Sequence, residues 1–281
     1  MSARAADGVP RGTPPGHAAA SGAASADGYA RLHSARGAAV VALASLADTV
    51  AAALTDDGTL HEYGARRLAE GQVGARRLQG RGPVYAVTLP DGHTRVVIRH
   101  AMHGGLLAPI TGDRFLAPTR APIELAAAIR LARAGVRTPE VVAYALYPAG
   151  PLLRRSDVAT REVAGRDLGE SLRDRPPAEE KRAMLAATAG LLAALARAGA
   201  RHPDLNVKNV LIARDGTAGA PVAHVLDVDR IRFLEPGHPR VAGANLARLA
   251  RSVRKWRALH GIDVTEQDLA WLAEQAAHAG R

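Results

Sequence analysis

Three oxygen-bearing side chains in the last third of the chain have the types and the spacing that phosphoryl transfer requires. Asp204 and Asn209 stand five positions apart, and Asp227 follows after a second apolar stretch. The reaction needs a carboxylate to orient and deprotonate the attacking hydroxyl, and hard oxygen ligands for a Mg²⁺ ion that neutralises charge on the phosphates. Asp204 suits the first task, and Asn209 and Asp227 suit the second.

The segments around these residues predict how they are positioned. A polar loop begins at His202 and feeds a short strand at 210–212, and a second strand at 222–226 ends directly before Asp227. A Gly-Thr-Ala-Gly turn at 216–219 could join the two strands as a hairpin. Asp and Asn are common in turns and caps, so the pair alone is weak. The preceding His and the following strand that ends on an Asp make the pattern more specific.

Length and composition narrow the possible functions. The 281 residues can form one large domain or two lobes, and the absence of cysteine excludes disulfides and a thiol nucleophile. A net charge of +10 favours anionic partners, although the heavy use of Arg, Ala and Gly reduces the weight of that charge as evidence. Aromatic residues make up only 3% of the chain, so a nucleic-acid partner is not expected.

Upstream, a predicted β-hairpin has a glycine-rich entry. Gly80 and Gly82 precede a strand that ends at Leu89, and a second strand at 94–99 ends on Arg99. Glycines at such a place let the backbone close over phosphates, and a cation two strands on can pair with them. A plain turn and a solvated strand end are the simpler alternatives.

A helix predicted at 119–134, with Pro122 in its first turn, places Glu124 where it can pair with Arg99. The alternative is an ordinary first-turn Glu favoured by the helix dipole. Two further strands, at 139–147 and 152–163, lead into a predicted hinge between two lobes. Backbone groups of Glu162 and Val163 could hold an adenine there.

The chain divides into four predicted parts. They are a disordered, low-complexity N-terminus at 1–28, a helical extension at 29–70 with a helix from 38 to 54, an N-lobe at 71–163, and a C-lobe at 164–281. The C-lobe should contain a long helix at 177–198, a basic helix at 245–260 and a final helix at 265–277. The basic helix is either a solvated face or a patch that meets an anionic membrane surface.

The order of these parts resembles the kinase-like superfamily, and more narrowly the bacterial lipopolysaccharide kinase family of the Kdo and heptose kinase type. The resemblance is carried by Val97-Ile98-Arg99-His100 with Gly104-Gly105-Leu106, by the segment 160–165, by the segment 202–211, and by Leu226-Asp227-Val228-Asp229-Arg230. It covers about 71–257. It implies an α+β, bilobal protein-kinase-like fold, with a small antiparallel β N-lobe and a mostly helical C-lobe.

The resemblance also implies ATP and Mg²⁺ as cofactors. It suggests Asp204 as catalytic base, Asn209 and Asp227 as metal ligands, and Arg99 with its partner Glu124 as phosphate contact. Gly80 and Gly82 would form the phosphate loop, and Glu162 and Val163 the hinge. The acceptor would be a sugar hydroxyl, that of Kdo (3-deoxy-D-manno-octulosonic acid) on a lipid A precursor. The site of action would be cytoplasmic, at the inner membrane face.

Departures from the kinase pattern leave alternatives open. Arg99 stands where kinases carry Lys, Pro203 where many protein kinases carry Arg, and Val228 where a Gly usually follows the metal-binding Asp. No Ala-Pro-Glu motif follows Asp227, which favours a small or sugar acceptor over a protein. The alternatives are a kinase acting on a heptose, another small molecule or a protein, and a nucleotide-binding pseudokinase.

Overall fold

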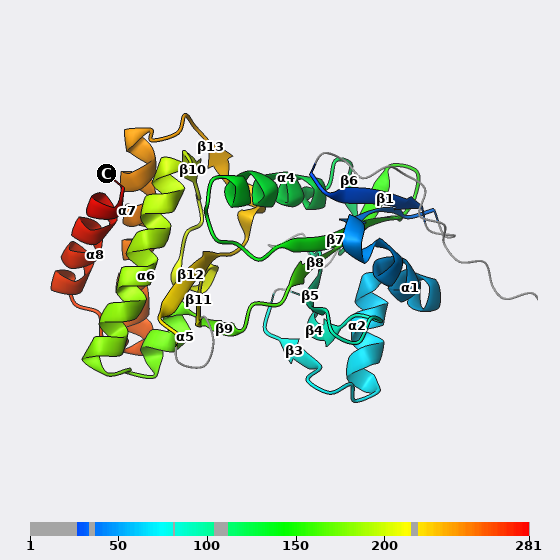
Figure 1. The fold of residues 1–281 in the computed structure, drawn as a ribbon, viewed down its shortest axis with the longest axis horizontal. Helices are drawn as coiled ribbons and strands as arrows, with labels where there is room; N and C mark the ends of the chain where they lie inside the picture. The colour runs from blue at the N-terminus through cyan, green and yellow to red at the C-terminus, as the bar shows by residue number, and fades with distance from the viewer. Residues whose placement is uncertain (1–26, 34–36, 81, 104–111, 215–218, 281) are drawn as a thin grey trace, which may run out of the picture.

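The computed structural model describes residues 27–33, 37–80, 82–103, 112–214 and 219–280. The disorder predicted for 1–28 falls almost wholly outside them. Within the described residues the chain forms a β-sheet lobe followed by a mostly helical lobe (Figure 1). The predicted α+β, bilobal architecture is therefore confirmed.

The first lobe is built on an antiparallel sheet with the strand order β1-β2-β7-β8-β5-β4-β3, and β6 pairs with the outer part of β8. The strands are β1 (Tyr29–His33), β2 (Ala39–Leu43), β3 (Arg76–Leu78), β4 (Val84–Thr88), β5 (Arg95–His100), β6 (Phe115–Leu116), β7 (Val141–Pro148) and β8 (Leu153–Arg161). The predicted hairpin at 83–99 corresponds to β4 and β5, whose register pairs Val84 with Arg99. This register places Arg99 beside the glycine-rich entry.

The prediction of a helical extension at 29–70 is wrong in its first half. β1 and β2 form a hairpin whose second strand pairs with β7, so these residues belong to the main sheet. Helix starts only after a short 3-10 turn (Ala44–Leu46), with α1 (Ala47–Asp57) and then α2 (Leu60–Ala69). Val40 and Ala42 are buried at alternate positions of β2. A short apolar run of this kind does not by itself distinguish a buried strand from a buried helix.

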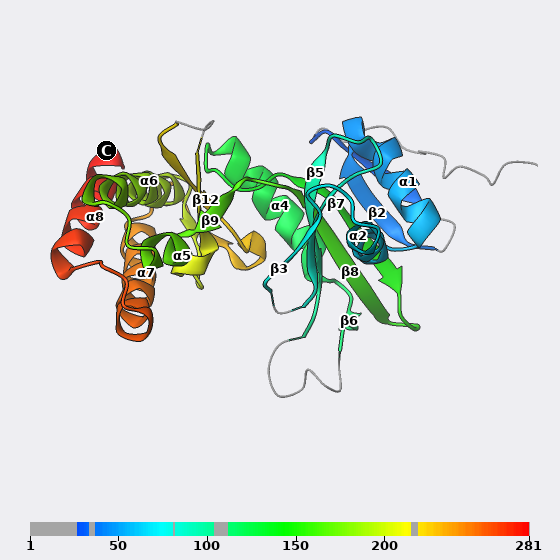
Figure 2. The same ribbon diagram turned by 90° about the horizontal axis from the view of Figure 1, so that it is seen from below.

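Helix α4 (Arg120–Arg133) packs against the sheet lobe and links it to the helical lobe. The helical lobe contains α5 (Leu168–Arg173), α6 (Ala178–Arg197), α7 (Pro239–His260) and α8 (Glu266–Ala279). Two small antiparallel sheets lie beside them (Figure 1). One contains β9 (Gly165–Asp167), β11 (Val210–Arg214) and β12 (Pro221–Val225), and the other pairs β10 (Ala200–Arg201) with β13 (Arg232–Phe233). Figure 2 shows β9 and β12 beside α5 and α6. The helices and the hairpin predicted for this lobe are present.

Hydrogen bonds between the connector after α4 and the end of β12 tie the two lobes together. The Val225 N–H donates to the Arg137 carbonyl at 2.9 Å, and the Thr138 hydroxyl donates to the Val225 carbonyl at 2.9 Å. Asp227 lies two residues further on, so its backbone is fixed at the junction of the lobes. No helix in the described ranges is long and apolar enough to cross a membrane.

Candidate active site

His202 anchors the loop that carries Asp204. The ring is buried, with 1% of the residue exposed, and its Nδ1 accepts the Asp204 N–H at 3.2 Å. Its Nε2 therefore carries the proton and donates to the Leu226 carbonyl at 3.0 Å. Burial lowers the pKa of His202, which keeps the ring neutral. One side chain thus fixes the loop that carries Asp204 to the end of the strand before Asp227.

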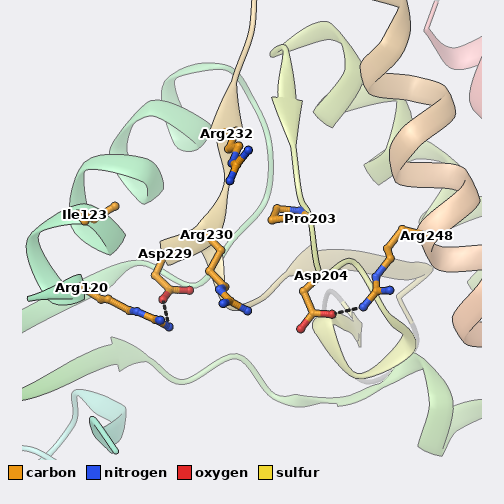
Figure 3. A pocket seen from close by; sticks show the side chains of 8 residues that line it. All are labelled: Arg120, Ile123, Pro203, Asp204, Asp229, Arg230, Arg232 and Arg248. Atoms are coloured by element: carbon orange, nitrogen blue, oxygen red, sulfur yellow. Dashed lines mark hydrogen bonds and ion pairs between the residues drawn. The ribbon is translucent and has the colours of Figure 1, made fainter. Parts of the chain in front are cut away.

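Asp204 presents one carboxylate oxygen to an arginine and leaves the other free. Arg248, on α7, donates from Nη2 to Asp204 Oδ1 at 2.5 Å. This hydrogen bond is the main cause of the lowered pKa of Asp204, so the carboxylate is ionised at neutral pH. Figure 3 shows the second oxygen turned away from Arg248, toward the open side of the site. That oxygen is placed to accept a proton from a hydroxyl.

Asn209 follows a single 3-10 turn (Val207–Asn209) whose N-terminus is capped by the Asn206 side chain. The Asn209 side chain is largely buried, and its Nδ2 donates to the Asp204 carbonyl at 2.8 Å. This bond fixes the orientation of the amide, so that Oδ1 is the group left for a cation. Oδ1 has no hydrogen-bond partner among the described residues. The five-residue spacing recognised in the sequence therefore closes a loop around one backbone carbonyl.

Asp227 has a left-handed backbone conformation, with φ of 53° and ψ of 51°. Asp tolerates this region better than most residues, and the conformation turns the chain sharply after β12. The carboxylate is 57% exposed and accepts from Arg99 Nη1 at 3.1 Å. The Leu226 N–H donates to the Asn209 carbonyl at 2.9 Å, which holds the segments of the two proposed metal ligands next to each other.

These donors suit Mg²⁺ rather than a metal held entirely by protein. The described residues contain no group of three or more His, Cys, Asp or Glu side chains that could hold an ion. Mg²⁺ typically takes one or two carboxylates and completes its octahedron with substrate phosphates and water. An amide oxygen and one exposed carboxylate at the junction of the lobes meet that requirement.

The predicted pair between Arg99 and Glu124 is present. The Arg99 guanidinium pairs with Glu124 on α4 and with Asp227, so it links β5, α4 and the segment after β12. Glu124 is 8% exposed, and burial raises its pKa while the guanidinium of Arg99 opposes that shift. Glu124 in turn raises the pKa of Arg99. Arg99 thus keeps its charge at the place where a kinase requires a cation.

Replacing Glu124 by Gln is expected to lower the free energy of unfolding by about 1.5–3 kcal/mol, because a largely buried, charge-assisted hydrogen bond is lost. Urea denaturation would measure the change. Glu140→Gln is the matched control, since Glu140 pairs with Arg161 where both side chains are 46% exposed. The control should lose no more than about 1 kcal/mol. Equal losses in the two variants would contradict a structural role for the buried pair.

Gly80 and Gly82 precede β4, as predicted, and they follow a short strand, β3, that was not predicted. A Cβ atom on Gly80 would lie 2.7 Å from Cγ2 of Val84, and one on Gly82 would lie 2.7 Å from Cγ of Met102. Both positions are therefore too crowded for a side chain without local movement. Residue 81 between them lies outside the described residues. The loop brings its backbone close to the end of β5, where Arg99 lies.

At the predicted hinge, Glu162 and Val163 differ in whether their backbone N–H groups are available to bind a ligand. The Glu162 N–H donates to the Arg95 carbonyl at 3.0 Å, and its carboxylate accepts from Arg95 Nε at 2.6 Å and also pairs with Arg76. Glu162 therefore ties the hinge to β3 and β5. The Val163 N–H has no partner within the described ranges, so an adenine contact from an N–H would fall to Val163 rather than to Glu162.

Sequence reasoning did not predict that Arg248 contacts Asp204. Arg248 belongs to the basic helix, which was interpreted as a solvated or membrane-facing surface. Arg254 and Arg257 are exposed side chains, 52% and 39% accessible, that pair with Glu266 at the surface, whereas Arg248 pairs with Asp204 in the site. One signal in the sequence indicates the role of Arg248: Asn245, a polar residue, lies three positions earlier on the same face of α7. Asn245 is fully buried and bonds the backbone of His202 and Ala200.

Arg248→Gln is expected to shift the acidic limb of the pH profile of kcat/KM to higher pH. Arg248 lowers the pKa of Asp204, so its loss lets the carboxylate take up a proton at less acidic pH. The measurement is kcat/KM between about pH 4.5 and 8. A variant with reduced activity but a profile that coincides with that of the native enzyme would contradict the electrostatic role and leave only a structural one.

The sheet lobe, the helical lobe and the polar groups at their junction define a kinase-like phosphotransferase. The carboxylate of Asp204, the oxygen donors of Asn209 and Asp227, and the cation of Arg99 meet where the lobes join. The order of these groups along the chain is the order found in that class.

Comparisons with known proteins identify the family. The model of the lipopolysaccharide kinase (Kdo/WaaP) family matches residues 71–275. The 3-deoxy-D-manno-octulosonic acid kinase of Stenotrophomonas maltophilia strain K279a is 31% identical over 203 residues, covering 69% of this chain and 74% of that protein. The enzyme of the same name from Vibrio parahaemolyticus is 29% identical over 199 residues, covering 69% and 79%. The chain belongs to the lipopolysaccharide kinase (Kdo/WaaP) family.

Among solved structures, WaaP in complex with acyl carrier protein is similar, with 21% sequence identity and a TM-score of 0.43. The match covers 75% of this chain and 92% of that one. Family membership makes this chain a phosphotransferase of lipopolysaccharide biosynthesis that acts on a sugar hydroxyl.

Proposed function

We propose that this chain transfers the γ-phosphate of ATP, with Mg²⁺, to a hydroxyl of Kdo on a lipid-linked acceptor. The observation that carries the proposal is the junction of the lobes, where Asp204 keeps one carboxylate oxygen free while Asn209 and Asp227 offer oxygen donors nearby. The naming of the curated relatives as Kdo kinases supports this choice of acceptor.

In the proposed reaction each group of the chain has one task. Asp204 orients the acceptor hydroxyl and takes its proton as the new O–P bond forms and the bond to ADP breaks. Asn209 and Asp227 would hold the Mg²⁺ ion, which supplies charge neutralisation on the phosphates. Arg99, held by Glu124, contacts the phosphates, the loop with Gly80 and Gly82 covers them, and Val163 contacts the adenine. The enzyme would act at the cytoplasmic face of the inner membrane, where a lipid-linked acceptor is available.

The test is transfer of label from γ-labelled ATP to a panel of acceptors. The panel holds a Kdo-bearing lipid A precursor, the same precursor without Kdo, a heptose-bearing acceptor and a generic protein substrate. The proposal predicts Mg²⁺-dependent labelling of the Kdo-bearing precursor alone. Labelling of the heptose-bearing acceptor or the protein instead would replace the acceptor assignment. Nucleotide binding without any transfer would favour a pseudokinase.

A further inference from the structure

A hollow of about 510 Å³ opens directly beside Asp204, on the side of its free carboxylate oxygen. Four arginines and two aspartates supply its charged groups. They are Arg120, Arg230, Arg232, Arg248, Asp204 and Asp229. Because the hydroxyl to be phosphorylated must reach Asp204, this hollow is where the acceptor has to lie.

Of the four arginines that line the hollow, two form ion pairs with its aspartates and two do not. Arg248 is bound to Asp204 at 2.5 Å, and Arg120 is bound to Asp229 at 3.3 Å. The side chains of Arg230 and Arg232 have no hydrogen bond or ion pair with any described residue. Figure 3 shows the Arg230 side chain directed toward the space between Asp229 and Asp204. The hollow therefore carries an excess of positive charge at the place where the acceptor meets the catalytic base.

The backbone, not a salt bridge, holds these two arginines in place. Arg230 ends the 3-10 turn that follows Asp227, and Arg232 begins β13, where it pairs with Arg201 of β10. The residues between and after them, Ile231 and Phe233, are partly buried against the core. Side chains alternate along an extended segment, so Arg230 and Arg232 are left exposed on the opposite side.

Two exposed guanidinium groups at alternate positions are suited to a planar anion, because each can donate a pair of parallel hydrogen bonds. The anion must belong to the same sugar as the reacting hydroxyl, or to its immediate neighbour, since the hollow adjoins Asp204. A carboxylate on the sugar itself meets this condition, whereas the phosphates of a lipid anchor lie further along the acceptor.

We infer that Arg230 and Arg232 bind the carboxylate of an acidic sugar acceptor and so select it over neutral sugars. This inference rests on the proposed function and assigns its acceptor specificity to residues of this chain. The guanidinium groups position the sugar, and Asp204 performs the proton transfer.

The experiment compares steady-state kinetics of the native enzyme, Arg230→Gln, Arg232→Gln and the double variant. Arg31→Gln is the control with the same charge change, since Arg31 is an exposed residue of β1, outside the lining of the hollow. Three acceptors are used: the Kdo-bearing lipid A precursor, its Kdo methyl ester, and the precursor stripped of its lipid A phosphates. KM is measured for acceptor and for ATP separately.

The expected result has three parts. Each single variant raises KM for the Kdo-bearing precursor by about tenfold or more, which corresponds to about 1.4 kcal/mol, and leaves KM for ATP unchanged. The native enzyme uses the methyl ester as poorly as the double variant uses the free acid. Removing the lipid A phosphates leaves the effect of each variant unaltered.

Several results would overturn the inference. If the native enzyme uses the methyl ester and the free acid equally well, the inference is refuted and the proposed function stands. A rise in KM for ATP would place the two arginines on the nucleotide phosphates. Loss of the variants' effect with the dephosphorylated precursor would assign them to the lipid anchor. A native enzyme that phosphorylates no Kdo-bearing acceptor would refute the proposed function as well.

Discussion

Replacing Asp204 by Asn is expected to reduce kcat for phosphoryl transfer by about 10²–10⁴-fold, the range that a positioned general base contributes. The substitution keeps the size and shape of the side chain but removes its ability to accept a proton. The amides of Asn206 and Asn209 donate to the backbone carbonyl of residue 204, and these bonds do not depend on its side chain, so the loop geometry is retained. The affinity for Mg²⁺-ATP should therefore not change.

Single-turnover transfer and a separate nucleotide-binding titration measure the two quantities. Asp263→Asn serves as the charge-matched control, because Asp263 is 68% exposed and pairs with Lys181, away from the junction of the lobes. The control should retain full activity. Undiminished turnover in Asp204→Asn would refute the assignment of Asp204 as base.

Asp227→Asn is expected to weaken Mg²⁺-ATP binding by more than about tenfold, equivalent to about 1.4 kcal/mol. The variant replaces the only carboxylate proposed to hold the metal with a weaker neutral ligand. It also removes an exposed ion pair with Arg99, which should cost little stability in the absence of ligand. The expected signature is an unchanged melting temperature without ligand and a smaller increase with it.

A thermal-shift titration of Mg²⁺ at fixed ATP makes this measurement, since a ligand that binds only the folded state raises the melting temperature according to its affinity. ATP without metal is the control condition and should affect the native enzyme and the variant alike. A metal dependence identical in the two proteins would contradict the role of Asp227 as a ligand and would move the metal to another group.

The parts of the site that sequence reasoning predicted are those with local signals. The spacing from Asp204 to Asn209 is set within one loop, and Asp227 lies two residues after β12, a strand that pairs with the preceding strand, β11. The ion pair of Arg99 and Glu124 joins β5 to α4, and the two residues are only 25 positions apart in the sequence. Each of these contacts is fixed by nearby sequence or by the order of elements.

The parts that were missed depend on contacts between distant segments. Arg248 reaches Asp204 across 44 positions, and although Asn245 marks its face of α7 as polar and buried, the sequence does not show which segment that face meets. Strand β2 pairs with β1 and also with β7, about a hundred residues later, and this distant pairing places its apolar residues inside the main sheet. Composition and periodicity indicate which residues are buried, but they do not indicate which distant segment packs against them.

The most direct test of the central claim is a crystal structure with Mg²⁺ and a non-hydrolysable ATP analogue. The account predicts the ion bound by Oδ1 of Asn209 and the carboxylate of Asp227, with the γ-phosphate between Arg99 and the free oxygen of Asp204. A nucleotide bound elsewhere, or a metal that contacts neither Asn209 nor Asp227, would contradict it.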